Sequence, residues 1–221
     1  MGKVNRLEVK EDNTRKMKIL NLYAGIGGNR KLWGDEHEVT AVEIDPEVVA
    51  IYKKHFPNDT VIVGDAHEYL LKHFEEFDFI WSSPPCPTHS DIRRMGVDIG
   101  QVEAVYPDMQ LYEEIILLKH FFKGQWIVEN VIGYYEPLIK PQEKARHYFW
   151  SNFIIGDFKS QHQVIIKELK GSETVFGFNV KDYKGKQSKR KLLRNCVDPK
   201  LGQYILECAF KTKQETLNKR I

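Results

Sequence analysis

A cysteine in a proline-rich turn is the first residue of this chain that could act as a catalyst. Cys86 follows the apolar run from Phe77 to Trp81 and the dipeptide Pro84-Pro85. The run reads as a buried strand, which the prolines end because neither ring nitrogen can donate to a sheet. A thiol just beyond the carboxyl end of a strand lies where open α/β sheets keep their reactive groups. We expect Cys86 to be a nucleophile. The alternative is a small buried apolar residue in a turn.

A carboxylate and an amide, Glu129 and Asn130, form the second candidate site. They follow the apolar run from Gln125 to Val128, which reads as another strand. A thiol nucleophile needs a partner that activates the electrophile it attacks, and a carboxyl group can deliver a proton to a ring nitrogen. We therefore expect Glu129 to lie at the same edge of the sheet as Cys86. The alternative for Glu129 is an ion-paired or helix-capping carboxylate.

A glycine-rich turn and two acids form the third candidate site. Residues 25–28 (Gly-Ile-Gly-Gly) follow an apolar run from Met17 to Tyr23. Glycines let the backbone approach a ligand closely, and the helix that follows offers free N–H groups to an anion. Glu43, at the end of the second strand, is placed to accept from a ribose hydroxyl, and Asp65, after the third, from an adenine amino group. Together they outline a nucleoside-shaped site. Alternatively, the glycines serve packing and Glu43 is a solvated charge.

Strands alternate with helices along the chain, which predicts an α/β fold with a doubly wound, mostly parallel sheet. The expected strands are residues 17–23, 38–44, 60–63, 77–81, 125–128 and 146–155, and helices are expected at 29–33, 46–56, 67–74, from 107 onward and from 198 onward. Residues 91–106 contain few periodic apolar residues and read as a long loop. After Gly156, short β-like runs at 163–166 and 174–178 predict a small β-rich insert.

Length, net charge and cysteine content limit the kinds of protein that this sequence can encode. The 221 residues suit one medium-sized domain with a small appendage, and the net charge of +2 means that any nucleic-acid contact must come from a local patch. The tract 184–194 is such a patch, with six basic residues and no acidic one. Three cysteines are too few for a disulfide framework, which favours a reducing, cytoplasmic location. No zinc-type cluster, signal-like start or membrane-length apolar run is evident.

The ordered motifs resemble those of the DNA cytosine-C5 methyltransferases. They are residues 23–28 (Tyr-Ala-Gly-Ile-Gly-Gly), 43–45 (Glu-Ile-Asp), 64–65 (Gly-Asp), 84–86 (Pro-Pro-Cys), 129–131 (Glu-Asn-Val), 142–146 (Gln-Glu-Lys-Ala-Arg) and 194–199 (Arg-Asn-Cys-Val-Asp-Pro). The similarity runs from Lys18 to about Phe210, leaving out the insert. Each motif is common, but their shared order and spacing are specific.

The resemblance implies the sheet of an S-adenosylmethionine-dependent methyltransferase, with S-adenosylmethionine as cofactor. The implied cofactor-binding residues are Tyr23, Ala24, Gly25, Ile26, Gly27, Gly28, Glu43, Ile44, Asp65, Ala66, Pro84, Asn195 and Val197. Cytosine would be flipped out of the duplex, because chemistry at a stacked base is blocked. Cys86, partly deprotonated, would attack C6 while Glu129 protonates N3. Asn130 belongs to this catalytic set, and Arg146 would contact the base and orient Glu129. No metal is implied.

The resemblance also implies double-stranded DNA as substrate. The implied DNA contacts are Ser90, Arg93, Arg94, Lys144, Lys186, Lys189 and Arg190. The chain departs from the family pattern at Pro87 (usually Gln), Lys144 (Arg), Arg194 (Gly) and Asp198 (Pro). Because the insert is short, we expect a short target sequence or help from a second subunit. A cognate nuclease of a restriction–modification system and a bacterial or phage-infected host are further expectations.

These observations predict four segments. Residues 1–15 form a flexible arm, 16–155 the catalytic and cofactor-binding domain, 156–190 a target-recognition insert, and 191–221 a segment and helix returning to the catalytic domain. Two other functions stay open. One is the same chemistry on RNA, such as tRNA. The other is a cofactor- and DNA-binding subunit without catalysis.

Overall fold

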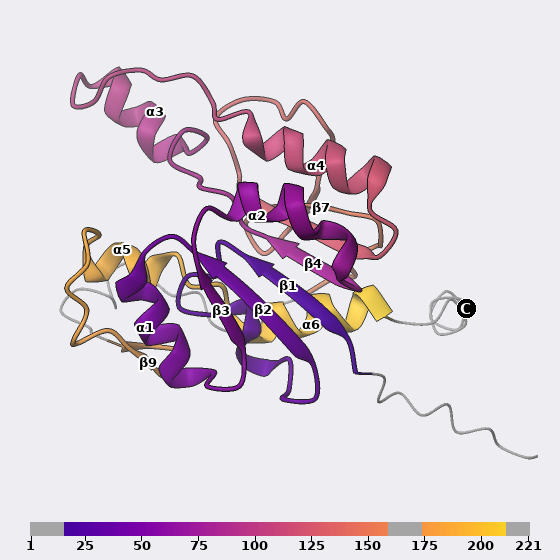
Figure 1. Cartoon of the computed structure of the whole chain (residues 1–221). Helices are drawn as coiled ribbons and strands as arrows, with labels where there is room; N and C mark the ends of the chain where they lie inside the picture. Colours follow the sequence, from indigo (N-terminus) through magenta and orange to yellow (C-terminus); the bar gives the residue numbers. More distant parts are fainter. Residues whose placement is uncertain (1–15, 159–173, 211–221) are drawn as a thin grey trace, which may run out of the picture.

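The computed structural model describes residues 16–158 and 174–210, and a seven-stranded sheet is its framework (Figure 1). The arm 1–15, the predicted run 163–166 and residues 211–221 lie outside the described residues. The strands are β1 (Lys18–Leu22), β2 (Glu38–Glu43), β3 (Thr60–Val63), β4 (Phe79–Ser82), β5 (Gln125–Val131), β6 (Gln142–Lys144) and β7 (His147–Ser151). Their order is β3-β2-β1-β4-β5-β7-β6. The pairs from β3 to β5 are parallel, whereas β7 and β6 are antiparallel. The predicted mostly parallel, doubly wound sheet is confirmed.

Helices connect the strands, and a small hairpin follows the sheet. The helices are η1 (Asn29–Leu32), α1 (Pro46–His55), α2 (Ala66–His73), η2 (Phe74–Glu76), α3 (Asp91–Asp98), α4 (Gln110–Phe121), α5 (Lys189–Arg194) and α6 (Pro199–Phe210). The hairpin pairs β8 (Thr174–Val175) with β9 (Phe178–Asn179). No helix in the described ranges is long and apolar enough to cross a membrane.

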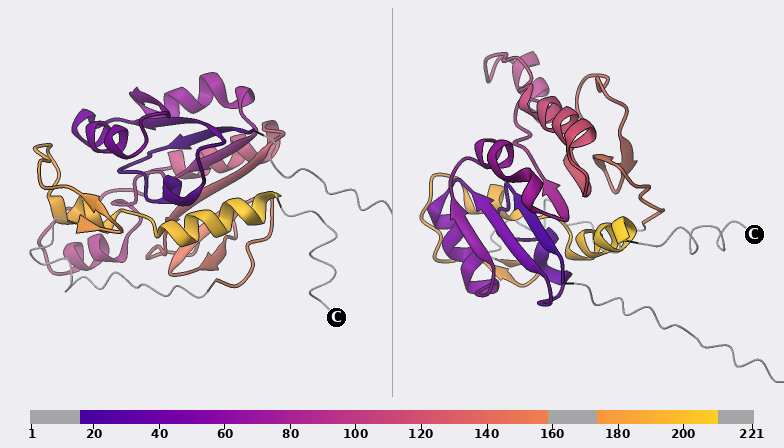
Figure 2. Two further views of the ribbon diagram at one scale, coloured as in Figure 1. Left: turned by 90° about the horizontal axis from the view of Figure 1, so that it is seen from below. Right: turned by 45° about the vertical axis from the view of Figure 1, so that its right-hand side comes forward.

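Alternating side chains send the sheet's apolar residues to two faces, as the period of a strand requires. On one face Leu20, Leu22 and Val128 pack with residues of α2 and α4. On the other, Ile19 and Trp81 pack with residues of α6, which lies along the sheet in Figure 2. A third cluster joins α1 to β9 and α5. The C-terminal elements are therefore part of the same packed body as the N-terminal strands.

Residues 91–106 do not form the predicted long loop throughout, because their first half is helix α3. Ser90 caps this helix by accepting a hydrogen bond from the Arg93 N–H, and Arg94 pairs with Asp98 one turn later. The apolar residues Ile92, Met95 and Ile99 are exposed. This helix is stabilised by local capping and charge pairing and has no stripe of buried apolar residues. A search for the apolar periodicity of a core helix therefore could not reveal it. In Figure 1 α3 projects from the body beside α4.

The end of β5 also differs from the prediction. Glu129 and Asn130 were expected to follow a strand, but β5 includes both because β7 pairs with it, Glu129 opposite Phe149 and Val131 opposite His147. The last predicted strand, 146–155, is shorter in the structure, since β7 begins at His147 and ends at Ser151. Arg146 lies in the preceding turn at φ 69°.

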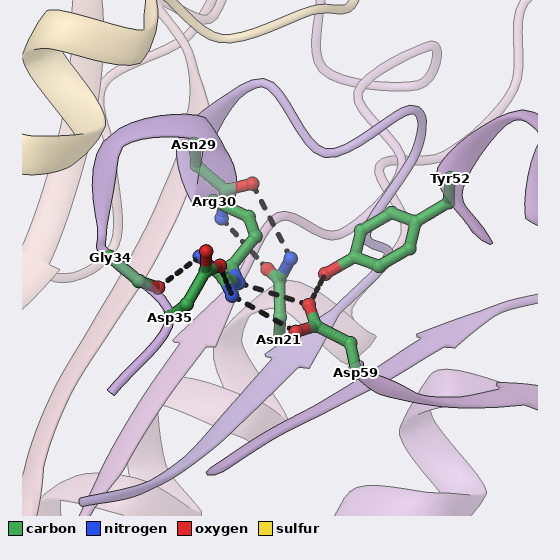
Figure 3. A network of polar contacts seen from close by, with 7 residues as sticks. All are labelled: Asn21, Asn29, Arg30, Gly34, Asp35, Tyr52 and Asp59. Atoms are coloured by element: carbon green, nitrogen blue, oxygen red, sulfur yellow. Dashed lines mark hydrogen bonds and ion pairs between the residues drawn. The ribbon is translucent and has the colours of Figure 1, made fainter. Parts of the chain in front are cut away.

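A buried ion pair anchors the segment after the glycine turn (Figure 3). Arg30 of η1 donates from Nε and Nη2 to the two carboxylate oxygens of Asp59 at 2.9 and 3.0 Å, and from Nη1 to the Gly34 carbonyl oxygen at 2.7 Å. The Tyr52 hydroxyl donates to Asp59 at 2.8 Å. These bonds tie η1 to α1 and to the loop before β3. They fix the segment that follows the glycine turn.

Candidate active site

A cavity of about 570 Å³ opens at the carboxyl edge of the parallel strands, where ligands bind in open α/β sheets. Its wall includes the turn after β1, the end of β2, the proline–cysteine turn after β4, the β5–β7 pair, and α5 with the segment that follows it. Of the predicted site residues, it is lined by Tyr23, Ala24, Gly25, Ile26, Gly28, Glu43, Ile44, Pro84, Cys86, Glu129, Asn130, Arg146, Asn195 and Val197. The structure therefore brings the predicted nucleophile and the predicted cofactor turn to one cavity.

Backbone bonds and one amide hold the turn that carries Cys86. The Cys86 carbonyl oxygen accepts from the N–H groups of His89 and Ser90 at 3.0 and 3.1 Å. Asn130 donates from Nδ2 to the Pro84 carbonyl oxygen at 3.0 Å. Pro84 and Pro85 have no N–H to donate to the sheet, and the amide of Asn130 links this turn to β5 instead. Asn130 therefore positions the turn.

The buried carboxylate of Glu129 is held by a histidine. His147 Nδ1 lies 2.6 Å from Glu129 Oε1, and both residues line the cavity. Their strands are paired, and the partner of His147 is Val131, two residues after Glu129, so the two side chains share a face. Arg146, the predicted orienting residue, lines the cavity, but the ion pair that the structure gives Glu129 is with His147. Sequence reasoning missed His147, because only the antiparallel register places it.

The surroundings of Cys86 favour its thiol form. Burial raises the pKa of Cys86, and the negative charge of Glu129 raises it further, while Lys191 and Arg194 act in the opposite direction. Partial deprotonation of Cys86 stays a prediction. Neutralising Glu129, or moving the positive charges of Lys191 and Arg194 closer to the sulfur, would lower the pKa of Cys86 and favour the thiolate.

The glycine turn is shaped for close approach. Gly28 packs so tightly against the segment 196–197 that an added Cβ would lie 2.3 Å from the Val197 carbonyl oxygen. Gly25 has φ +55°, and a Cβ there would meet nothing within 4 Å, so this position faces open space. Glu43 supports the turn by accepting from the Gly25 N–H at 3.0 Å, and from the Asp45 N–H at 3.0 Å.

A second polar network, around Glu114, supports the turn after β1. The Tyr23 hydroxyl donates to Glu114 Oε1 at 2.7 Å, and the Ser82 hydroxyl donates to Glu114 Oε2 at 2.5 Å. His67 Nδ1 lies 3.2 Å from Glu114 Oε1, and the hydrogen bond to this carboxylate raises the pKa of His67. Glu114 of α4 is fully buried. It therefore joins the turn after β1 to the end of β4.

Three predicted cofactor residues lie away from the cavity wall. Gly27 has φ +87° and packs against Phe56 and Tyr52. Asp65 caps α2 by accepting from the Glu68 N–H at 2.9 Å, and Ala66 is the buried first residue of that helix. The interpretation of Asp65 as a ligand of adenine stays a prediction.

The predicted DNA contacts lie outside the cavity lining, and several have partners within the chain. Ser90 caps α3, Arg93 Nη2 donates to the Glu103 carbonyl oxygen at 3.0 Å, and Arg94 pairs with Asp98 at 3.1 Å. Lys144 pairs with Asp157 at 2.7 Å. Lys186 and Arg190 are exposed, and Lys189 donates to the Lys181 carbonyl oxygen.

Two cations of the basic tract do line the cavity, although neither was predicted as a site residue. Lys191 and Arg194 lie three residues apart on α5, which places them on one side of the helix. Arg194 is also one of the departures from the family pattern. The i, i+3 spacing within the tract was a usable signal, but the side of α5 that meets the cavity depends on how the helix packs.

A comparison with models of known families identifies the family of this chain. The model of the family described as C-5 cytosine-specific DNA methylase matches residues 17–137. A solved structure of a DNMT2 mutant from Spodoptera frugiperda is 26% identical with TM-score 0.36, covering 52% of this chain and 35% of that one. A putative DNA modification methyltransferase of an E. coli prophage is 19% identical with TM-score 0.37, covering 55% and 34%. The matched region thus spans about a third of either protein. No curated protein matches the chain.

Proposed function

Because the chain belongs to the C-5 cytosine-specific DNA methylase family, we propose that it transfers a methyl group from S-adenosylmethionine to C5 of cytosine in DNA. The observation that carries this proposal is the shared cavity. Cys86, Glu129 and the glycine turn all line it, although they are far apart in sequence. A non-catalytic binding subunit would have no chemical need for a thiol and a buried carboxylate at one site.

The cavity wall fits the proposed cofactor. The open position at Gly25 leaves room for a ligand beside the backbone, and Glu43 offers carboxylate oxygens to a ribose. Ile44 is 68% exposed although it lines the cavity, so it offers an apolar surface to an aromatic ring. When bound, S-adenosylmethionine supplies an activated methyl group.

The protein's own groups prepare the cytosine for that methyl group. The Cys86 sulfur adds to C6 while Glu129 gives a proton to N3, so that C5 gains electron density. Once C5 carries the methyl group, loss of the C5 proton and return of the N3 proton to Glu129 restore the C5–C6 double bond and expel the thiolate. Since Glu129 raises the pKa of Cys86, proton transfer from the carboxyl group to N3 and loss of the thiol proton are coupled.

The proposed substrate is a flipped base in double-stranded DNA. A base stacked in a duplex cannot reach a thiol in the wall of a cavity, so the nucleotide must leave the stack. Lys191 and Arg194 line the cavity and are candidates for phosphate contacts of that nucleotide, in addition to Lys186, Lys189 and Arg190. We keep the prediction that a second subunit or a cognate nuclease works with the chain.

The test is nucleoside mass spectrometry of DNA from cells that lack cytosine methylation, after expression of the intact chain or Cys86→Ala. We expect 5-methylcytosine with the intact chain and a loss of about 10³-fold or more in the variant, because the nucleophile is gone. Cys208→Ala is the matched control, since this buried thiol lies outside the cavity lining.

Purified protein with duplex DNA and with tRNA separates the two nucleic acids. Methylation of tRNA alone would replace DNA with RNA as the substrate. Equal turnover by Cys86→Ala would contradict the covalent mechanism. Binding of S-adenosylmethionine without methylation of either nucleic acid would favour the non-catalytic subunit.

A further inference from the structure

The contact between His147 and Glu129 goes beyond the roles that the family resemblance assigns. The histidine Nδ1 lies 2.6 Å from Oε1 of the carboxylate that the proposed chemistry uses as proton donor. Glu129 has only 10% of its side chain exposed, whereas 35% of the His147 side chain is exposed. A hydrogen bond this short to a buried carboxylate fixes the orientation of both groups.

The backbone explains why a histidine takes this place and the neighbouring arginine does not. Ala145 and Arg146 have φ of 48° and 69°, so the chain turns tightly just before β7 begins. His147 is the first residue of β7 and pairs with Val131, which points its side chain to the same face as Glu129. The structure assigns to His147 the contact that the motif predicted for Arg146.

We propose that His147 is a positioning residue that holds Glu129 through a charged hydrogen bond and makes proton delivery to cytosine N3 depend on the protonation of its imidazole. This inference rests on the proposed methyl transfer. An arginine in this role keeps its charge at every accessible pH, whereas a histidine loses its charge near neutrality. A histidine at this position therefore gives kcat a pH dependence that an arginine would not give.

The proton balance of this step is simple. The pair begins as a carboxylate and an imidazolium, and Glu129 takes up the proton that the Cys86 thiol loses as its sulfur adds to C6. The O–H bond so formed breaks as the N3–H bond forms, and the electron pair stays on the carboxylate, which the imidazolium stabilises while keeping its own Nδ1 proton. When the thiolate leaves, the N3 proton returns through Glu129 to the sulfur, so the pair ends as it began. The only proton lost overall is that of cytosine C5.

The surrounding charges favour the charged imidazole over part of the neutral range. Burial alone would lower the pKa of His147, and the adjacent Arg146 also lowers it, but the carboxylate of Glu129 outweighs both and raises it. The charge of Glu129 also raises the pKa of Cys86, whereas Lys191 and Arg194 lower it. The pKa of His147 therefore lies above that of an ordinary histidine, and the imidazolium, with its support of Glu129, is lost as pH rises through it.

The test is the pH profile of kcat for three forms of the full chain: wild type, His147→Arg and His147→Gln. We expect the wild type to lose kcat on the alkaline side. His147→Arg should stay within about tenfold of wild type near pH 7 and lose that alkaline limb, because arginine stays charged. His147→Gln keeps a donor without charge and should lose about 10²-fold or more in kcat.

The matched control is His73→Arg. His73 Nδ1 lies 2.7 Å from Glu76 Oε1 on the surface, so it repeats the pairing outside the cavity. This variant should keep both the activity and the profile of wild type. A wild-type kcat in His147→Gln, or an unchanged alkaline limb in His147→Arg, would overturn the inference.

A second readout needs no methyl transfer. In NMR titrations of the protein alone, the His147 resonance, identified by its loss in His147→Gln, should titrate at lower pH in Glu129→Gln than in wild type. An unchanged titration would overturn the inference. If wild type is inactive while this shift is present, the proposed methyl transfer has failed and the pairing stands.

Discussion

At the scale of single residues, the surroundings of the proposed nucleophile Cys86 favour its thiol form. Burial and the charge of Glu129 both raise the pKa of Cys86. A protein with a preformed thiolate in this cavity would be open to alkylation and oxidation before substrate arrives. The arrangement instead ties thiol activation to the arrival of a group that neutralises Glu129 or screens its charge.

The Glu129→Gln variant tests this coupling. Removing the negative charge should lower the pKa of Cys86, which increases the thiolate fraction at pH 8. We expect iodoacetamide to label Cys86 a few-fold to about tenfold faster than in wild type, since one pKa unit is a factor of ten in thiolate. Peptide mass spectrometry reads out the labelling of each cysteine.

Two comparisons make this result specific. Glu143→Gln removes an exposed carboxylate outside the cavity lining and should leave the labelling of Cys86 unchanged. Cys196, whose pKa burial raises to about 12, should stay unlabelled in every variant. Labelling of Cys86 that is equal or slower in Glu129→Gln would show that this carboxylate does not control the thiol.

The site residues that sequence could predict are those whose position follows from a strand end. Cys86 follows the carboxyl end of β4 and Glu43 is the last residue of β2, and the carboxyl ends of parallel strands meet at one edge whatever the details of packing. His147 could not be found in this way, because its place depends on an antiparallel register and on a turn with two left-handed residues. Lys191 required knowledge of how α5 packs.

At the scale of helices and strands, the sequence also predicts those elements whose position follows from a general rule and misses the others. Apolar periodicity located the parallel strands, α4 and α6, because each buries a stripe or a face in the core. It did not locate α3, whose apolar side is exposed, or the three-residue β6. Elements fixed by capping, charge pairing or a neighbouring strand leave no hydrophobic pattern.

The stability of η1 and its junction with the glycine turn rests on one carboxylate. Arg30 contacts Asp59 and Asp35, but the Arg30 and Asp59 side chains are 3% exposed while that of Asp35 is 87% exposed. Asp59→Ala leaves a buried guanidinium without its partner, and we expect a loss of about 3–5 kcal/mol in the free energy of unfolding. Urea denaturation measures this value.

Asp35→Ala is the internal control for that prediction. It removes a carboxylate that pairs with the same arginine at 3.6 Å on the surface. Because exposed ion pairs contribute little, we expect a change within about 0.5 kcal/mol. Equal effects of the two substitutions would mean that the buried bidentate pair contributes no more to stability than the exposed one.

At the scale of the whole molecule, the cavity joins the two ends of the described chain. Its wall runs from Tyr23 after the first strand to Leu201 in the last helix. Gly28 also packs directly against residues 196 and 197. A ligand in this cavity contacts parts of the body that come together only when the chain is folded, so its binding energy adds to global stability.

S-adenosylmethionine should therefore stabilise the protein against heat. At a concentration 100 times Kd, linkage gives about 2.7 kcal/mol, which corresponds to a rise in Tm of about 5 to 10 °C for a chain of this size. Glu43→Ala should lose most of this rise, because Glu43 lines the cavity and supports the Gly25 backbone. Differential scanning calorimetry with and without cofactor measures both.

Whether Glu43 binds the cofactor is decided by the rise in Tm on adding S-adenosylmethionine, not by the Tm without it. Glu43→Ala also removes two hydrogen bonds to backbone N–H groups, so its Tm without cofactor should be lower than that of wild type. Glu47→Ala, an exposed acid in the first turn of α1 outside the cavity lining, should keep the full rise. If Glu43→Ala keeps it too, the cofactor does not use the acid at the end of β2. If wild type shows no rise at saturating concentration, the cavity binds some other ligand, and the assignment of the glycine turn to S-adenosylmethionine fails with it.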